Sequence, residues 1–368
     1  MGWCAWCEPD GQGIGRRQLL LLLAQAALVA AAPRRSEGFS IYDESGDVKI
    51  GQQADPEILG QFGYYDGADL QNYVAQVGRQ IVATSDTRFS FQFKVLDHPM
   101  INAMALPGGF VYVTRGMLGE LNNEAQLAGI LGHETTHVNS RHTAKLLTKA
   151  FGAQIATLLG IGAAAAARSG SAATGVAMIS GHVTNYLLLG YGREFEQEAD
   201  EVGLHYAFRS GYDPREMVTF LRLLRRKEVL RGQTLYHGFE ATHPDTSTRI
   251  AKADTVANMI VTEGSRPEVN ADMPISRQPN RELYLTGGGR LEVKADAYKA
   301  ALDGLRYGEA KERLRLAAYK VKPGDTLASV ARDQMQDEGR RFELAGLNGL
   351  GDDAPLSPGS VLKIILKR

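Results

Sequence analysis

Apolar residues recur at three- and four-residue intervals in three segments of the chain, the spacing of a helix that packs one face against a core. These segments are residues 70–81, residues 122 to about 149, and about 186 to 209. Asn122 or Asn123 can cap the second helix, because either side chain can accept a hydrogen bond from a free backbone N–H. The apolar stripes of the first two helices consist of Leu70, Tyr73, Val74, Val77, Ile81, Leu127, Ile130, Leu131 and Val138.

Two shorter segments have the two-residue alternation and the β-branched and aromatic content of strands. They read "FSFQFKV" at residues 89–95 and "GGFVYVT" at residues 108–114. We expect them to pair in an antiparallel direction. With the helices, they predict an α+β fold: a mainly helical domain with a small antiparallel β-sheet.

The first 32 residues differ from the rest of the chain. Arg16 and Arg17 precede an apolar run of 14 residues, 19–32, which ends in small residues. This order is typical of a secretory signal peptide, with either the general secretory or the twin-arginine route open. The run is short for the roughly 30 Å of a bilayer core, so an uncleaved anchor is the weaker alternative. We therefore expect a periplasmic protein whose residues 33–55 form a linker.

Composition and charge exclude several classes of partner. The chain has 41 basic and 42 acidic residues, so no net field attracts nucleic acid or an anionic membrane surface. Cys4 and Cys7 lie within the signal region, which leaves the mature chain without a disulfide. The Ala- and Gly-rich residues 151–190 predict buried or surface-lying helices near the site in preference to a membrane span.

The sequence "HETTH" at residues 133–137 supplies a candidate metal site within the second predicted helix. Residues four apart on a helix lie on one face, so His133 and His137 can bind the same ion. Glu134 projects beside them, where it can hold a water molecule and act as the general base. This division of roles is that of HExxH zinc hydrolases, and it predicts one Zn²⁺ per chain.

A catalytic zinc site needs a third protein ligand and one position left for water. The third predicted helix carries "REFEQEADEVG" at residues 193–203. Among its acids, Glu196 and Asp200 share a face at the four-residue spacing. One of them can therefore bind the metal while the other supports a ligand histidine.

Four ordered motifs resemble the HExxH metallopeptidases of the HtpX, BepA and CAAX prenyl protease group over about residues 55–260. They are "NAMALPGGFVYVTRGML", "HETTH", "EQEAD" and "THPDTSTRI". The resemblance implies a gluzincin-like metallopeptidase domain, which we place at residues 56–262. It makes Glu196 the third zinc ligand and Asp200 the support of a zinc histidine.

The same resemblance assigns two further features. His243, in the "HP" motif, approaches the zinc from a loop and either stabilises the oxyanion or caps the metal in a resting state. Gly109, Phe110 and Val111 belong to an edge strand on which an extended substrate pairs. His142 lies about half a turn away from His133 on a continuous helix, so we expect it to have a structural or surface role.

The C-terminal residues 317–368 form a separate module after an irregular connecting region at 263–316. "YKVKPGDTLASVARD" and "LSPGSVLKI" predict a turn and helix cap followed later by a closing strand. These segments resemble a LysM domain. The resemblance implies a βααβ fold and binding to peptidoglycan.

The combined features predict an exported zinc-dependent endopeptidase that hydrolyses unfolded or misassembled envelope proteins and is tethered to peptidoglycan, with outer-membrane association left open. The alternative is a latched, mainly non-proteolytic chaperone-like factor for outer-membrane protein assembly, in which His243 keeps the zinc capped. The wall-binding module also raises a peptidoglycan amidase, which the peptidase motifs disfavour.

Overall fold

A computed structural model describes residues 43–147, 190–231, 239–243, 246–264 and 291–367. The predicted signal peptide with Cys4 and Cys7, and nearly all of the Ala- and Gly-rich segment 151–190, lie outside the described residues, as do His182 and His237. Within the described ranges, no helix is both long enough and apolar enough to span a bilayer.

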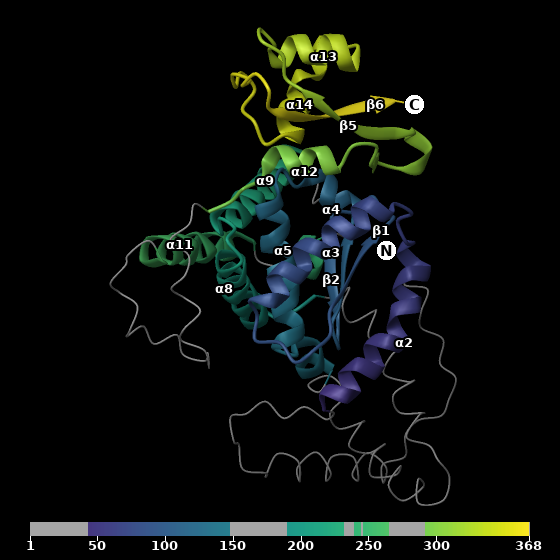
Figure 1. Ribbon diagram of the computed structural model, residues 1–368, viewed down its shortest axis with the longest axis vertical. Helices are drawn as coiled ribbons and strands as arrows, with labels where there is room; N and C mark the ends of the chain where they lie inside the picture. The colour runs from purple at the N-terminus through teal and green to yellow at the C-terminus, as the bar shows by residue number, and fades with distance from the viewer. Residues whose placement is uncertain (1–42, 148–189, 232–238, 244–245, 265–290, 368) are drawn as a thin grey trace, which may run out of the picture.

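The first part of the chain is mainly helical around one small sheet, in agreement with the predicted α+β class (Figure 1). Figure 1 shows α5 in the middle, with the sheet and α2 on one side and α8 and α11 on the other. The elements in chain order are α2 (Glu44–Phe62), α3 (Ala68–Ala83), β1 (Gln92–Leu96), β2 (Ala103–Leu106), β3 (Phe110–Thr114), α4 (Arg115–Glu120), α5 (Glu124–Asn139), α8 (Arg193–Arg209), α9 (Arg215–Arg231), α10 (Phe239–Thr242) and α11 (Thr246–Gly264).

Helix α2 contradicts the predicted linker over residues 44–55, whereas residues 33–42 of that prediction lie outside the described residues. Its N-cap is Asp43, whose side chain accepts a hydrogen bond from the backbone N–H of Gly46. The helix buries an apolar face with four-residue spacing, which packs beside β2. That face consists of Ile50, Ala54, Ile58 and Phe62.

The sheet has the order β1-β3-β2, which corrects the expected pairing of residues 89–95 with 108–114. β1 and β3 run parallel, whereas β2 and β3 are antiparallel. The short strand β2 reverses the chain once before β3 reverses it again. Because "AMAL" is uniformly apolar and buried, it has no alternation by which the sequence could reveal it.

Helix α5 is capped by Asn123, whose side chain accepts a hydrogen bond from Gln126 N at 2.8 Å. It ends at Asn139, before the predicted end near residue 149, and a new helix begins at His142.

α5 crosses α8 very closely at two glycines. A Cβ added to Gly132 would lie 2.8 Å from Gly203 O, and one on Gly203 would lie 2.7 Å from His133 N. Larger residues at either position would separate the two helices that carry the predicted site.

The C-terminal part contains α12 (Ala295–Ala301), β4 (Arg306–Tyr307), η2 (Ala310–Glu312), β5 (Leu314–Lys320), α13 (Leu327–Met335), η3 (Glu338–Arg340), α14 (Arg341–Leu347) and β6 (Val361–Lys367). The three strands form one antiparallel sheet in the order β4-β5-β6. β5, α13, α14 and β6 supply the predicted βααβ order. Because α12 and β4 belong to the connecting region 263–316, that region is not irregular throughout.

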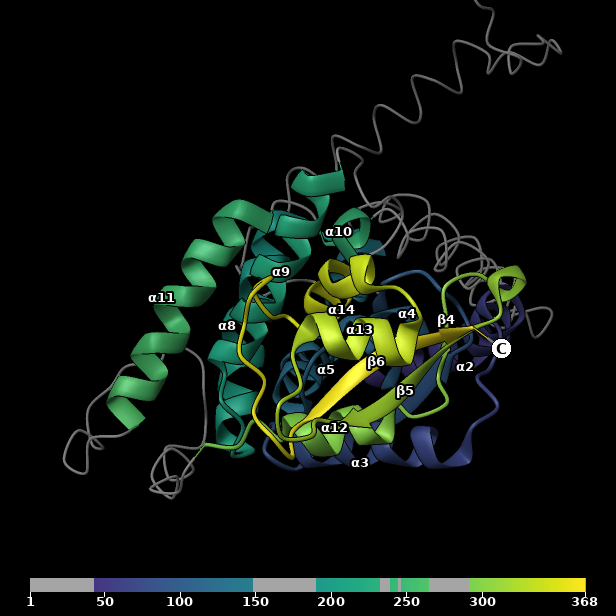
Figure 2. The ribbon, with the colours of Figure 1, turned by 90° about the horizontal axis from the view of Figure 1, so that it is seen from above.

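This C-terminal part packs directly on the helical part near the N-terminal end of α5 (Figures 1 and 2). Lys363 of β6 is buried, and its Nζ donates hydrogen bonds to Gly119 O and Leu121 O, each at 2.7 Å. Tyr298 of α12 donates to Leu118 O at 2.7 Å. One continuous apolar core joins the two parts.

Candidate metal centre

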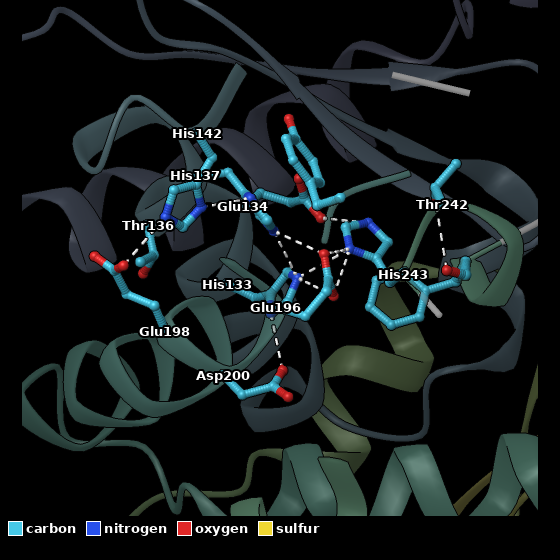
Figure 3. A network of polar contacts seen from close by, with 12 residues as sticks. His133, Glu134, Thr136, His137, His142, Glu196, Glu198, Asp200, Thr242 and His243 are labelled. Atoms are coloured by element: carbon cyan, nitrogen blue, oxygen red, sulfur yellow. Dashed lines mark hydrogen bonds and ion pairs between the residues drawn. The ribbon is translucent and has the colours of Figure 1, made fainter. Parts of the chain in front are cut away.

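Three elements bring four donor side chains together at the middle of the helical part (Figure 3). α5 carries His133 and His137, α8 carries Glu196, and His243 follows α10. One donor atom from each of these residues lies within 4.8 Å of all the others, and all four residues are buried. The predicted ligands therefore converge, and His243 joins them.

The separations match those expected around a tetrahedral ion. Bonds of about 2.0–2.1 Å to zinc place neighbouring ligand atoms roughly 3.3 Å apart. His133 Nε2 lies 3.0 Å from His137 Nε2 and 3.2 Å from His243 Nδ1. Glu196 approaches His243 Nδ1 to 2.9 Å, His137 Nε2 to 3.5 Å and His133 Nε2 to 3.6 Å. The set fits a zinc ion with His243 in the fourth position.

The ring of His137 is kept in the neutral form that a metal requires. Burial, together with the neighbouring His133, lowers the pKa of His137 well below its ordinary value. The ring is stacked on Tyr191, with centroids 3.9 Å apart and an interplanar angle of 20°. Tyr191 in turn shares a 2.8 Å hydrogen bond with Thr143. The sequence reasoning did not identify Tyr191.

Glu134 differs from the other acids of the centre. Its side chain is fully buried, and neither carboxylate oxygen has a hydrogen-bond partner among the described residues. His243 Nε2 lies 3.5 Å from Glu134 Oε1. Burial raises the pKa of Glu134, which makes it a better proton acceptor. Such an acid is suited to hold and deprotonate a water molecule at the metal position.

Asp200 lies behind His133, as expected from the resemblance. Its Oδ1 is 3.0 Å from His133 Nδ1, the nitrogen that faces away from the metal position. Burial alone would raise the pKa of Asp200, but the adjacent Arg249 outweighs it and holds that pKa well below its usual range. Asp200 therefore remains a carboxylate that can orient His133.

Arg249 connects the parts of this centre, and the sequence reasoning missed it. Its guanidinium donates to both oxygens of Asp200, at 2.7 and 2.6 Å, and to His243 O at 2.9 Å. The same group lies 2.8 Å from Glu196 Oε2. The only available signal was its place as the arginine of "THPDTSTRI".

His142 is buried and is not among the four donors, but the expected continuous helix is wrong, because α5 ends before it. His142 begins the next helix, and its Nδ1 lies 2.9 Å from His137 Nδ1. The remaining described histidines, His98 and His205, are not among these donors.

The predicted substrate strand also requires correction. Phe110 and Val111 lie in β3, the central strand, where β1 and β2 occupy both backbone edges. Gly109 precedes β3, and its carbonyl accepts a hydrogen bond from Gln92 N at 2.8 Å. The strand at the edge of the sheet that packs against α5 is β2, Ala103–Leu106.

Comparison with known proteins identifies the family. The model of peptidase family M48 matches residues 68–257, which is just over half of the chain and includes all four donor residues. The chain belongs to peptidase family M48. A LysM domain model matches residues 319–364. Both resemblances drawn from the sequence are thereby confirmed.

Two kinds of curated relative are similar to this M48 chain. The beta-barrel assembly-enhancing protease of Escherichia coli K12 is 27% identical over 283 residues, covering 70% of this chain and 56% of the relative. The mitochondrial metalloendopeptidase OMA1 of Schizosaccharomyces pombe is 31% identical over 213 residues, covering 56% of this chain and 59% of the relative. The chain thus spans little more than half the length of these relatives.

Proposed function

We propose that this protein is a zinc-dependent endopeptidase. The observation that carries the proposal is the convergence of His133, His137 and Glu196 beside Glu134, a buried carboxylate without a hydrogen-bond partner among the described residues. Three protein ligands and an adjacent acid are the requirements of water-activated peptide hydrolysis. Membership of a peptidase family supports the same conclusion.

Each residue of the centre has a defined task in this reaction. His133, His137 and Glu196 would hold the zinc ion, which would lower the pKa of the attacking water and polarise the scissile carbonyl. Glu134 accepts the proton of the attacking water and passes it to the leaving amine. Asp200 holds the His133 ring with Nε2 toward the ligand cluster, and Arg249 keeps Asp200 and Glu196 in place.

His243 gives the protein a capped resting state in this proposal. Its Nδ1 lies with the other donor atoms, at the position that water and substrate need. For cleavage, the His243 ring must therefore withdraw from that position. The hydrogen bond from Arg249 to His243 O stabilises the capped position. Once withdrawn, the imidazole can serve as the oxyanion stabiliser, so both predicted roles belong to one residue in two positions.

The substrate class we propose is unfolded or misassembled protein of the cell envelope. An extended segment would add by main-chain hydrogen bonds along β2, which runs beside α5. Main-chain pairing favours unfolded chains over folded ones. The printed name of the Escherichia coli relative, a beta-barrel assembly-enhancing protease, supports a role in envelope protein assembly.

We also propose that the protein acts in the periplasm and that its LysM region binds peptidoglycan. The support is the signal-like N-terminus together with the LysM match at residues 319–364. The loops at 321–326 and 349–360 are largely exposed on this module. Cosedimentation of the full chain with purified peptidoglycan tests this part, and a protein that stays in the supernatant contradicts it.

The central experiment compares digestion of an unfolded protein by the wild type and by Glu134→Gln, with bound zinc measured in both. Activity should fall by about 10²- to 10⁴-fold, because the proton acceptor is lost, while zinc content is unchanged. Glu201→Gln on the exposed surface of α8 is the matched control and should retain activity. Full activity of Glu134→Gln would overturn the assignment.

His243→Ala separates the peptidase from the chaperone-like alternative. Removal of the capping ring should increase digestion severalfold, because opening the fourth position outweighs the loss of the oxyanion stabiliser. No digestion by either the wild type or His243→Ala, with zinc bound in both, would instead favour a mainly non-proteolytic factor.

A further inference from the structure

The helix breaks immediately after α5, before the next helix begins at His142. α5 ends at Asn139, with Ser140 as its C-cap, and Arg141 adopts the left-handed conformation with φ 53°. The Arg141 side chain forms an ion pair with Asp47 of α2, which is buried. A continuous helix would carry residue 142 to the far side of residue 133. The break instead turns His142 back toward the ligand cluster.

His142 meets the rear of a metal ligand. Its Nδ1 lies 2.9 Å from His137 Nδ1, and both rings are buried. His137 points Nε2 toward the other donor atoms, 3.0 Å from His133 Nε2. A ligand nitrogen must be unprotonated, so the proton of neutral His137 belongs on Nδ1. His137 therefore donates this hydrogen bond, and His142 Nδ1 accepts it.

That assignment also fixes the state of His142. With Nδ1 accepting, its own proton lies on Nε2, which is 3.4 Å from Glu198 Oε2. Ser140, at the helix break, donates to the other oxygen of Glu198 at 2.7 Å. The His142 ring is also stacked on Phe195, with centroids 4.4 Å apart and an interplanar angle of 14°. The contacts therefore run from His137 through His142 to Glu198 (Figure 3).

We infer that His142, oriented by Glu198 and Ser140, is the positioning residue for the metal ligand His137. Its task is to fix the tautomer and ring orientation of His137, as Asp200 does for His133. The inference rests on the proposed metal centre. Outer partners of this kind typically change metal affinity by about 10- to 100-fold.

The test measures zinc affinity of the full chain by competition with a chelator. His142→Phe keeps an aromatic ring against Phe195 but removes the acceptor for His137. Its zinc dissociation constant should rise on the order of 10- to 100-fold. His142→Gln, which offers an oxygen acceptor, should recover part of that loss. The visible spectrum of the cobalt-loaded protein should change in His142→Phe, because the geometry of a ligand changes.

Two further measurements separate positioning from folding. Glu198→Gln leaves His142 in place and should weaken zinc binding less than His142→Phe, while Glu201→Gln on the same helix should have no effect. The unfolding of the metal-free protein, followed in denaturant, should be similar in wild type and Glu198→Gln. If His142→Phe fails to fold, weaker zinc binding by a folded Glu198→Gln carries the test.

The outcomes distinguish this inference from the proposed function. If the wild type binds no divalent metal, the metal centre itself is wrong. If the wild type binds zinc and both His142→Phe and Glu198→Gln bind it equally well, only the role of His142 is overturned. Weakened binding that His142→Gln does not restore at all also counts against it.

Discussion

The two ends of helix α5 place charged groups in the protein interior in opposite ways. At the N-terminal end, Glu124 accepts hydrogen bonds from Tyr73 at 2.5 Å, Tyr212 at 2.6 Å and Lys294 at 2.9 Å. In the second half of the helix, Glu134 has no hydrogen-bond partner for either oxygen among the described residues. The first acid is held by three hydrogen-bond donors, whereas the second has none among the described residues.

This contrast distinguishes structural acids from functional acids in this fold. A buried charge with several donors ties elements together, and here Glu124 joins α3, α5 and the segments before α9 and α12. A buried charge without donors destabilises the folded state, because it has lost its hydration and gained nothing in exchange. Such a group is retained where a reaction needs a strong proton acceptor. The pairing of an acid is therefore as informative as its burial.

The largest expected effect comes from Arg249→Met, which would leave two more acids of the metal centre without a charged donor. Asp200 and Glu196 would lose their buried cationic partner, and breaking such a pair costs about 3–5 kcal/mol. Denaturant unfolding of the metal-free protein measures this loss. Arg88→Met, which removes an exposed ion pair with Glu44, is the control and should cost less than about 1 kcal/mol. Equal losses in both variants would contradict the contrast.

An intermediate effect is expected at the paired end from Lys363→Met. The carbonyls of Gly119 and Leu121 would lose their charged donor. These carbonyls lie just before α5, where the C-terminal part packs on the helical part. The free energy of unfolding should fall by about 2–3 kcal/mol, while zinc affinity remains unchanged. Lys367→Met, at the exposed end of the same strand, should be neutral. Zinc loss in proportion to stability would show that the two ends are not independent.

The smallest effect is the pH dependence of Glu124→Gln. Burial opposes ionisation of Glu124, but hydrogen bonds from Tyr212, Tyr73 and Lys294 outweigh it and lower its pKa below the ordinary 4.5. A lowered pKa stabilises the fold above about pH 4.5, and this contribution is lost as the pH falls through the folded-state pKa. The stability gap between wild type and variant, about 1–2 kcal/mol at pH 7, should shrink below that point. Denaturant unfolding from pH 7 to pH 3 measures the gap, and a gap that widens in acid would reverse the assigned sign.

Several elements could be predicted because their signals are local. The spacing of Leu70 to Ile81 predicted α3, and Asn123 was one of two proposed caps for α5. His133 and His137 were placed on one face because helix geometry alone puts residues four apart together. The turn at Pro323 and the following helix were legible for the same reason. The choice of Glu196 as the third ligand came from family resemblance, because helical spacing did not distinguish Glu196 from Asp200.

Other features depend on contacts between residues far apart in the sequence, so no local pattern could predict them. The strand β2 has no alternation of apolar and polar residues, so the sequence could not predict it. The parallel pairing of β1 with β3, which depends on β2, was therefore also missed. Arg249 acquires its role only when α11 packs on α8 and its guanidinium reaches Asp200. The direction in which His142 points could not be predicted, because nothing in the sequence signals that the helix breaks at Arg141, where an ion pair accompanies the left-handed turn.

The sequence by itself determined which side chains could bind a metal from one helix, because the 3.6-residue period is a property of the backbone. Tertiary structure decided which residues complete the centre: the glycine crossing brings Glu196 and Asp200 to His133, and the turn at Arg141 brings His142 to His137. Those approaches depend on packing between segments far apart in the chain. That packing is set by the shape and burial of both partners together.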